Sequence, residues 1–432
     1  MPPLHLSPKK EWRTTLLAAL SAFCVYTCMY AFRKPFTAAD FEKQQVLWGV
    51  DYKIWLVIAQ TIGYTASKFF GISFIGSLNT DKRASSILKL VAIGWVALLF
   101  FALFPAPFNI VFLLINGFPL GVIYGLVFSY LEGRRTTEFL GAVLSASFIF
   151  ASGFTQSVGK FVMLQWQVSE WWMPWITGLL FFPLLVLFTW LLDKTPAPDQ
   201  RDISLRTQRQ PMTKKRRKDF IKTFFPGLVM LIAAYVMLTV IRDYRSNFAS
   251  NMWSELGYSK NAAVFTQSEL PASLVVLILM GLLVLVKKNI HALLINHVVI
   301  IAGFFIAIIS SLLFMDDNLS PFWWMTLTGV GLYMGYVPFN CMLFERLIAS
   351  FRYVSNAGFI IYVADSFGYL GSNGILLVKN FSSLDISWTT FFIKMVLVVS
   401  VAGIILVALS AAYFQKKYNQ YSPPVNPRLN YG

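Results

Sequence analysis

Apolar runs of eighteen or more residues recur from one end of this 432-residue sequence to the other. A helix of that length crosses a hydrocarbon core about 30 Å thick, where every backbone polar group must be bonded within the protein. The composition agrees, because only 13% of the residues are charged, whereas soluble domains carry about a quarter. The sequence therefore predicts an all-α membrane protein with many spans.

Twelve membrane helices are expected, and a single long polar segment interrupts the apolar runs between the sixth and the seventh. The twelve cover about residues 14–36, 52–78, 86–105, 108–131, 139–162, 172–193, 225–249, 262–286, 291–315, 321–346, 355–380 and 388–414. We expect a first six-helix half over 1–193, a basic cytoplasmic linker over 194–224, a second six-helix half over 225–415 and a cytoplasmic tail over 416–432.

The loops alternate in charge. One side, which includes the N-terminus, the linker and the tail, holds 24 Lys and Arg residues, and the opposite side holds six at most. Because basic loops stay inside, we expect both termini in the cytoplasm of a plasma (inner) membrane. The net charge of +16 then reflects loop position and lipid-headgroup contact, and no nucleic-acid partner is expected.

Cytoplasmic cations of the first half recur in the second half at a nearly constant distance. The pairs are Lys82 and Lys287, Arg135 and Arg346, and Arg13 and Lys222, at offsets of 205, 211 and 209 residues. This repeat indicates two pseudosymmetric halves of six helices. Such halves joined by a long central linker are the layout of major facilitator transporters, whose substrate site lies between the halves.

Three cations inside the apolar spans are candidates for a binding site. Arg33 follows Arg13 by twenty residues, and Arg242 follows Lys222 by the same distance, so pseudosymmetry would place the two arginines opposite each other across a central cavity. Lys68 lies near the middle of the second span, where a cation normally faces water or a partner. Guanidinium groups bind phosphate or carboxylate oxygens in a bidentate fork, so an anion site is predicted.

Simpler roles remain open for the same residues. Arg33 and Arg242 could each extend to the outer interface of the membrane, and Lys34 and Arg245 are expected there.

Two carboxylates inside the spans need a role as well. Asp365 on the eleventh helix and Glu269 on the eighth are candidate ion-pair partners for Lys68, or proton carriers, and a structural hydrogen-bond role is as consistent with each.

Four short stretches resemble one transporter family. "YAFRKPF", "GYTASKFFG", "VIRDY" and "AGFIIYVADSFGYLGS" lie on the first, second, seventh and eleventh helices. Together they resemble the organophosphate:phosphate antiporters of the major facilitator superfamily, the glycerol-phosphate and sugar-phosphate transporters. The resemblance implies that Arg33, Lys34, Lys68 and Arg242 line the substrate cavity and that the two arginines hold the phosphate.

The sequence also departs from that family. Phe150 stands where bacterial members often carry a His on the fifth helix, and Asn247 stands where an Asp follows the seventh-helix Arg, although Asp243 is close. The chain is therefore expected to represent a divergent branch.

The predicted function is secondary active transport of a small organic anion, foremost a phosphorylated metabolite, by alternating access. Inorganic phosphate or protons would be the counter-substrate, and we expect a monomer. A transporter-like sensor that binds an anion and signals to a partner is the alternative. Neither a cofactor nor a metal site is expected, because Cys24, Cys28 and Cys341 lie in apolar spans without a nearby His. An enzymatic site is not expected either, since no paired-carboxylate or Ser-His arrangement occurs.

Overall fold

The computed structural model describes residues 8–41, 44, 46–77, 80–132, 134, 136–196, 214–351, 357–381 and 386–420. Within these ranges the chain is helical apart from turns and an isolated bridge between Leu47 and Val50. The first half contains α1 (Pro8–Tyr30), η1 (Pro35–Ala38), α2 (Tyr52–Ser77), η2 (Thr80–Lys82), α3 (Arg83–Leu103), α4 (Ile110–Leu120), α5 (Ile123–Leu131), α6 (Thr137–Gln165) and α7 (Met173–Asp193). The second half contains α9 (Lys214–Asn247), α10 (Ala249–Glu255), α11 (Val264–Val284), α12 (Asn289–Met315), α13 (Pro321–Cys341), α14 (Leu343–Ser350), α15 (Ala357–Phe381) and α16 (Trp388–Gln420).

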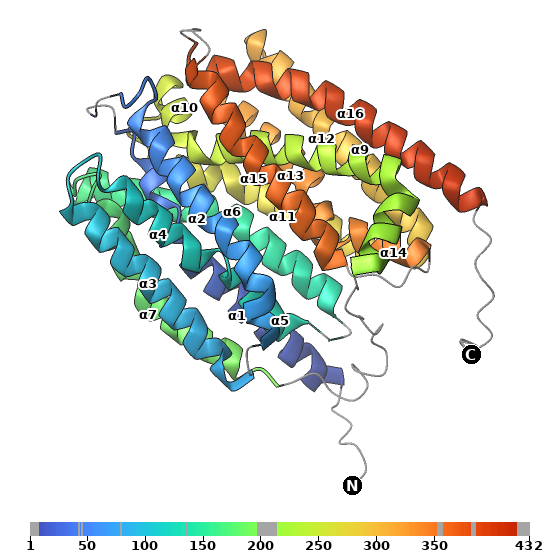
Figure 1. Cartoon of the computed structure of the whole chain (residues 1–432). Coiled ribbons are helices and arrows are strands. Elements are labelled where there is room, and N and C mark those ends of the chain that lie inside the picture. Colours follow the sequence, from blue (N-terminus) through green and yellow to red (C-terminus); the bar gives the residue numbers. More distant parts are fainter. Residues whose placement is uncertain are drawn as a thin grey trace.

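The helices form two bundles that lie side by side (Figure 1). The bundle of α1 to α7 fills the lower left of the view and the bundle of α9 to α16 the upper right, with α6 and α11 packed along each other between them. The expected fold of twelve membrane helices in two six-helix halves is confirmed. Most of the expected linker (residues 197–213), the tail beyond residue 420 and Arg135 lie outside the described residues.

The membrane helices differ in how apolar they are. In the described chain, eight spans are long and apolar enough to cross a membrane by composition, with α4 and α5 counted as one, and the bent pair α13 and α14 brings the number to nine. The other three long helices, α1, α2 and α15, have 23, 26 and 25 residues. Each of these three contributes tyrosines to the central cavity, and α2 and α15 also contribute Lys68 and Asp365, and such polar side chains lower the hydropathy of a span.

Two expected spans are interrupted. The fourth breaks between Leu120 and Ile123, and the tenth bends by 48° between α13 and α14. Pro119 and Pro338 lie just before these breaks. Because a proline lacks the N–H that continues a helix and its ring clashes with the preceding turn, each weakens the helix where it bends.

Two helix ends also lie beyond the apolar runs. Helix α9 begins at Lys214 instead of residue 225, and α16 continues to Gln420. Hydropathy marks the hydrocarbon crossing, whereas a helix can continue into water with its basic residues solvated.

Close backbone contact between α2 and α4 supports the first half. A Cβ atom on Gly117 would lie 2.2 Å from the carbonyl oxygen of Gln60, and one on Gly63 would lie 2.1 Å from that of Leu114. Only glycine leaves room for this approach, as at small-residue contacts of other membrane helices. The pairing brings Gln60 and Tyr64 of α2 to the centre of the molecule.

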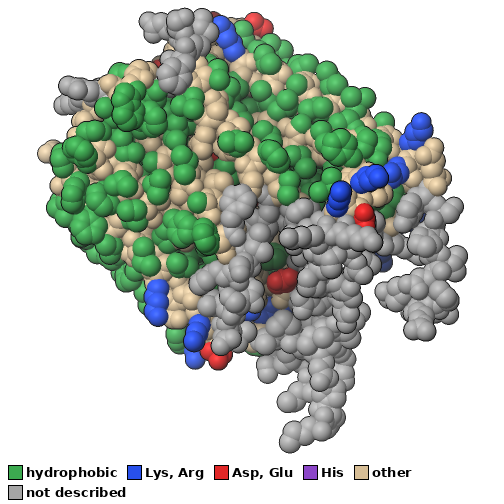
Figure 2. Space-filling view, viewed as in Figure 1, with side chains coloured by type: hydrophobic (Ala, Val, Ile, Leu, Met, Phe, Trp, Pro, Cys, Tyr) green, Lys and Arg blue, Asp and Glu red, His purple; other side chains and the backbone are tan. Residues whose placement is uncertain are grey.

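The outer surface is apolar. Hydrophobic side chains cover most of the described face in Figure 2, and Lys and Arg lie mainly along its lower and right margins. Large side chains such as Leu282, Ile278 and Val398 are 59%, 63% and 71% exposed. An apolar surface of this extent suits lipid and not water. The protein is a polytopic integral membrane protein.

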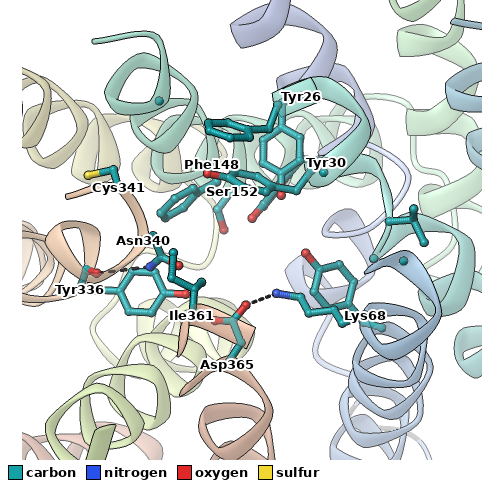
Figure 3. A pocket seen from close by; sticks show the side chains of 18 of the residues that line it. Tyr26, Tyr30, Lys68, Phe148, Ser152, Tyr336, Asn340, Cys341, Ile361 and Asp365 are labelled. Atoms are coloured by element: carbon teal, nitrogen blue, oxygen red, sulfur yellow. Dashed lines mark hydrogen bonds and ion pairs between the residues drawn. The ribbon is translucent and has the colours of Figure 1, made fainter. Parts of the chain in front are cut away.

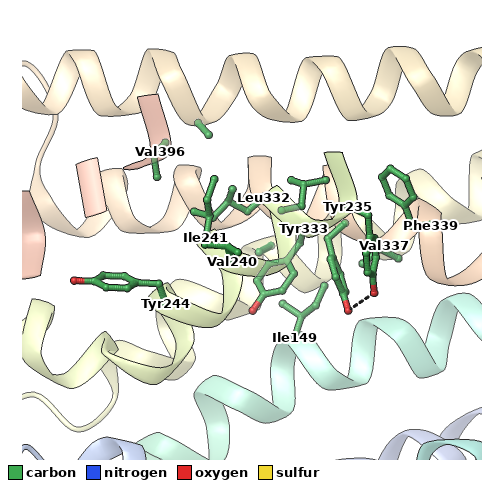
Figure 4. Close-up of a cluster of buried hydrophobic side chains, with 14 of the residues drawn as sticks. Ile149, Tyr235, Val240, Ile241, Tyr244, Leu332, Tyr333, Val337, Phe339 and Val396 are labelled. Atoms are coloured by element: carbon green, nitrogen blue, oxygen red, sulfur yellow. Dashed lines mark hydrogen bonds between the residues drawn. The ribbon is translucent and has the colours of Figure 1, made fainter. Parts of the chain in front are cut away.

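A compact core joins α9 to α13 in the second half. Ile241, Leu332 and Val337 pack there with the rings of Tyr235, Tyr333 and Phe339 (Figure 4). The hydroxyl oxygens of Tyr235 and Tyr336 lie 2.9 Å apart, within hydrogen-bond distance. The core thereby holds a pair of tyrosines against the cavity described next.

Candidate functional site: a cationic cavity between the halves

A cavity of about 480 Å³ lies between the two halves. Its deep end is lined by Arg33, Lys34 and Arg242. Its other end reaches Glu138 at the start of α6 and Glu345 on α14, on the side of the molecule where α1 begins. The cavity therefore extends toward the side that carries the N-terminus.

Arg33 occupies a turn directly after α1. The N–H groups of Arg33 and Lys34 both donate to the carbonyl oxygen of Tyr30, at 3.0 and 2.9 Å, and Pro35 then starts η1. The guanidinium carbon of Arg33 lies 3.8 Å from the centre of the Tyr64 ring, a cation–π contact. Its Nε is buried without a hydrogen-bond partner in the described structure. The guanidinium of Arg33 is therefore held by a ring and keeps its donors free.

Two amide side chains fix the backbone at this turn. Gln60 Nε2 donates to the carbonyl oxygen of Arg33 at 2.9 Å and to Asn116 Oδ1 at 2.8 Å. Asn116 Nδ2 in turn donates to the carbonyl oxygens of Phe32 and Gly94, at 3.0 and 2.8 Å. Sequence reasoning missed both amides, although a buried Gln or Asn in an apolar span is a signal that a polar partner lies nearby.

Arg242 is held differently. Its Nη2 and Nε both donate to Asp243 Oδ1, at 2.6 and 3.2 Å, and its guanidinium carbon lies 4.0 Å from the centre of the Tyr336 ring. The side chains of Arg242 and Asp243 are each 13% exposed. One edge of this guanidinium is therefore already occupied by a carboxylate.

Lys68 and Asp365 form an ion pair across the cavity. Figure 3 shows the Lys68 ammonium on α2 and the Asp365 carboxylate on α15 extending toward each other from opposite walls. Asp365 also accepts a hydrogen bond from the hydroxyl of Tyr235. The expectation that Lys68 has a carboxylate partner is thus met by Asp365, and the pair ties one half to the other.

Lys34 and Arg245 do not extend to the surface of the protein, so the expectation that they snorkel to an interface is wrong for both. Lys34 is 6% exposed, and its Nζ donates to Ser246 Oγ at 2.7 Å and to Asn247 Oδ1 at 2.6 Å. Arg245 is 2% exposed and donates to the carbonyl oxygen of Met325 at 2.9 Å. Both are buried because η1 and α10 close the cavity on this side and exclude the solvent that a snorkelling side chain needs.

Glu269 does not line the cavity and is not the partner of Lys68. It is 7% exposed and forms an ion pair with Arg245, beside the contact of α11 with α6. Gly153 of α6 makes this contact close, since a Cβ there would lie 2.6 Å from Glu269 Cγ. Phe150 also lies outside the cavity lining and packs on Phe23, with ring centres 5.8 Å apart.

Polar contacts close the cavity at its deep end. Gln156 Nε2 donates to Thr37 Oγ1 at 2.6 Å and to the carbonyl oxygen of Ser246 at 2.8 Å, and Ser152 Oγ lies 2.9 Å from Ser246 Oγ. Ser250 Oγ donates to the carbonyl oxygen of Ala38 at 2.9 Å. These contacts join the halves on the side away from the N-terminus.

The deep part of the cavity has an excess of positive charge. Four cations line this part (Arg33, Lys34, Lys68 and Arg242) together with the carboxylates of Asp243 and Asp365, whereas the other three carboxylates of the lining, Glu132, Glu138 and Glu345, belong to its opposite end. The carboxylates pair with Arg242 and Lys68, whereas Arg33 and Lys34 have no carboxylate partner in the part of the chain that the structure describes. Six of the seven residues that the sequence predicts for the site thus line one cavity, and Glu269 alone lies elsewhere.

Solved structures share the architecture. A D-xylose–proton symporter superposes with a TM-score of 0.61 at 13% identity, over 93% of this chain and 96% of that chain. A bacterial homologue of the human lysosomal transporter Spinster, in an inward-facing and unoccupied conformation, gives 0.57 at 11% identity, over 95% and 99%. At these identities the likeness shows the major facilitator fold alone.

Sequence comparison places the chain in a family without naming a substrate. A search of curated proteins found no relative, so the organophosphate antiporters are not supported in this way. The model of a family described as "Family of unknown function (DUF5690)" matches residues 35–417, most of the length of the chain, and the chain belongs to this family.

Proposed function

We propose that the protein is a secondary active transporter of a small phosphorylated organic anion that works by alternating access of the cavity between its halves. The observation that carries the proposal is the pair of uncompensated cations, Arg33 and Lys34, at the deep end of that cavity. A partly buried guanidinium with free donors binds phosphoryl oxygens in a bidentate fork, and Lys34 adds a point charge.

The charge balance favours a dianion. With Arg242 paired to Asp243 and Lys68 to Asp365, two positive charges remain for a ligand. A phosphate monoester carries up to two negative charges near neutral pH, and it has three oxygens for the donors of Arg33, Lys34 and Arg242. The tyrosines that line the same cavity, among them Tyr26, Tyr124 and Tyr369, offer ring faces and hydroxyls to the organic part.

The direction of access follows from loop charge. We propose that both termini face the cytoplasm of a plasma (inner) membrane, so the cavity described above opens inward. The xylose–proton symporter and the Spinster homologue are transporters by their names, which agrees with a transport role for the shared fold.

Binding is tested by thermal stabilisation of the detergent-purified protein with inorganic phosphate, glycerol phosphate, hexose phosphates and dicarboxylates. A ligand at a hundred times its dissociation constant adds about 2.7 kcal/mol to the stability of the native state. We expect a phosphate ester to stabilise the protein, and Arg33→Lys to weaken its affinity about tenfold to a hundredfold, because a point charge cannot reproduce the fork. Arg242→Lys is the matched variant in the other half.

Flux through liposomes separates the alternatives. Uptake that internal phosphate accelerates indicates exchange, and uptake driven by a proton gradient indicates symport. A phosphate ester that binds in an Arg33-dependent manner without any flux would contradict transport and favour the anion sensor. If no anion stabilised the protein and Arg33→Ala behaved like the parent, the proposal of an anion site would be contradicted.

A further inference from the structure

The two cavity arginines are not equivalent, and the difference lies in the residue that follows each of them. Position 34 in the first half corresponds to position 243 in the second at the offset of 209 that relates Arg33 to Arg242. Lys34 reaches across to Ser246 and Asn247 of the other half, whereas Asp243 turns back onto its own neighbour. One half thus presents an open arginine and the other an arginine that holds an anion of the protein.

The helix does not impose the pairing of Arg242 with Asp243. Adjacent residues on an α-helix project about 100° apart and do not normally face each other. Here the guanidinium nevertheless places both Nε and Nη2 on Asp243 Oδ1, and its flat face rests on Tyr336. The Nε–Nη2 edge of Arg242 is one of the edges that bind an oxyanion in a fork, and Asp243 covers it.

Asp243 itself lines the cavity. An anion that approaches Arg242 therefore meets a negative carboxylate on the same edge and must displace it or be repelled by it. When the anion leaves, the Asp243 carboxylate can bind the guanidinium again, because Asp243 directly follows Arg242 in the chain and stays within reach.

We propose that Asp243 is an internal competitor anion that weakens substrate binding at Arg242 and so permits its release. The proposal rests on the anion-transport function proposed above. A transporter must release what it binds on the far side, and a cavity with three uncompensated cations would hold a dianion too tightly to turn over. In this scheme Arg33 and Lys34 attract the substrate anion throughout, whereas at Arg242 the Asp243 carboxylate can take the place of the substrate anion.

The test measures affinity and turnover together, with inorganic phosphate as the probe. Asp243→Asn is expected to lower the dissociation constant for phosphate at least about tenfold, since it removes a charged competitor, while phosphate exchange at saturation becomes slower. A residue with a merely structural role would not raise affinity and lower turnover at once. Unchanged or weaker phosphate binding in Asp243→Asn would overturn the proposal, as would tighter binding with exchange as fast as in the wild type.

A double-variant cycle shows whether Arg242 is the group that Asp243 competes for. In an Arg242→Ala background, Asp243→Asn is expected to change phosphate affinity much less, because no guanidinium remains to be uncovered. An equally large gain in phosphate affinity in both backgrounds would mean that Asp243 acts only through the net charge of the cavity, and this result would overturn the proposal. Asp316→Asn, which removes a carboxylate at an exposed turn after α12, is the control for net charge and folding and should change neither quantity.

The measurements distinguish the anion site from the competitor role of Asp243. If Arg33→Ala abolishes phosphate binding and Asp243→Asn has no effect, the competitor role falls and the anion site stands. If the wild type and Asp243→Asn both fail to bind phosphate or a phosphate ester, the proposed function and the competitor role fall together.

Discussion

At the scale of single residues, the anion-binding groups are supported by tyrosines. The guanidinium groups of Arg33 and Arg242 lie 3.8 and 4.0 Å from the ring centres of Tyr64 and Tyr336. A ring face stabilises a cation without using any of its N–H donors, so the arginine stays charged in a partly buried place and its fork stays available. A carboxylate partner for Arg33 would occupy the donors that a ligand needs.

The ring of Tyr64 is therefore expected to matter more than its hydroxyl. Tyr64→Phe keeps the cation–π contact and should leave phosphate affinity within about threefold, whereas Tyr64→Leu should weaken it about tenfold or more, since a desolvated contact contributes about 2 kcal/mol. Isothermal titration of the purified variants measures both. Equal losses in the Phe and Leu variants would assign the effect to the hydroxyl instead.

At the scale of helices, the position of Arg33 depends on how closely α2 packs against α4. Gln60 and Tyr64, the two α2 residues that hold Arg33, lie on the face of the helix that meets the backbone of α4 at Gly117. A shift of α2 would therefore move two groups together: the Gln60 amide, which donates to the carbonyl oxygen of Arg33, and the Tyr64 ring, which contacts its guanidinium. The geometry of the site is thus a property of the helix pair.

Gly117→Ala tests this dependence. The added Cβ would lie 2.2 Å from the carbonyl oxygen of Gln60 and 3.0 Å from the amide nitrogen of Tyr64, both backbone atoms that cannot rotate away. We expect destabilisation by about 1–3 kcal/mol and weaker phosphate binding, measured as a lower melting temperature and a higher dissociation constant. Gly281→Ala on α11, where nothing lies within 4 Å of the new Cβ, is the control and should be neutral or slightly stabilising. Equal effects at the two glycines would contradict the packing argument.

At the scale of the whole molecule, the contacts between the halves differ on the two sides of the cavity. Hydrogen bonds that Gln156, Ser152 and Lys34 form with Ser246 close the deep side. On the side where α1 begins, the halves are joined by the Lys68–Asp365 pair and by Arg346 Nη2, which donates to Glu138 Oε2 at 3.0 Å. Rocking of the halves would have to break the first set to expose the cavity on the other side of the membrane.

A reversible cross-link on the deep side tests whether that movement is needed. In a protein whose three native cysteines are replaced by alanine, Ser152→Cys with Ser246→Cys places two thiols where the hydroxyls are 2.9 Å apart, within reach of a bond of about 2 Å. Oxidation should abolish phosphate exchange in liposomes, and a reductant should restore it, while phosphate still binds from the open side. Continued exchange by the fully cross-linked protein would contradict alternating access, and Ser152→Cys alone controls for oxidation.

The sequence by itself determined the class and plan of the protein. Long apolar runs can satisfy their backbone groups in a bilayer only as helices, so the twelve spans and the polytopic topology follow from local composition. The offset of about 209 residues indicated two halves, and the cost of burying Arg33, Lys68 and Arg242 in apolar spans pointed to a central cavity. These inferences needed no knowledge of which helices touch.

Only the tertiary structure decided the pairing of charges. That Lys68 meets Asp365, that Glu269 meets Arg245 and that Lys34 is buried between the halves depend on contacts between residues far apart in the chain, which no local pattern encodes. The turn of Arg242 onto Asp243 is a choice of rotamer that neighbouring positions in a helix would not suggest. Burial and electrostatic pairing are properties of three-dimensional distance, so the sequence could name the charged residues of the cavity but not which of them remain free to bind an anion.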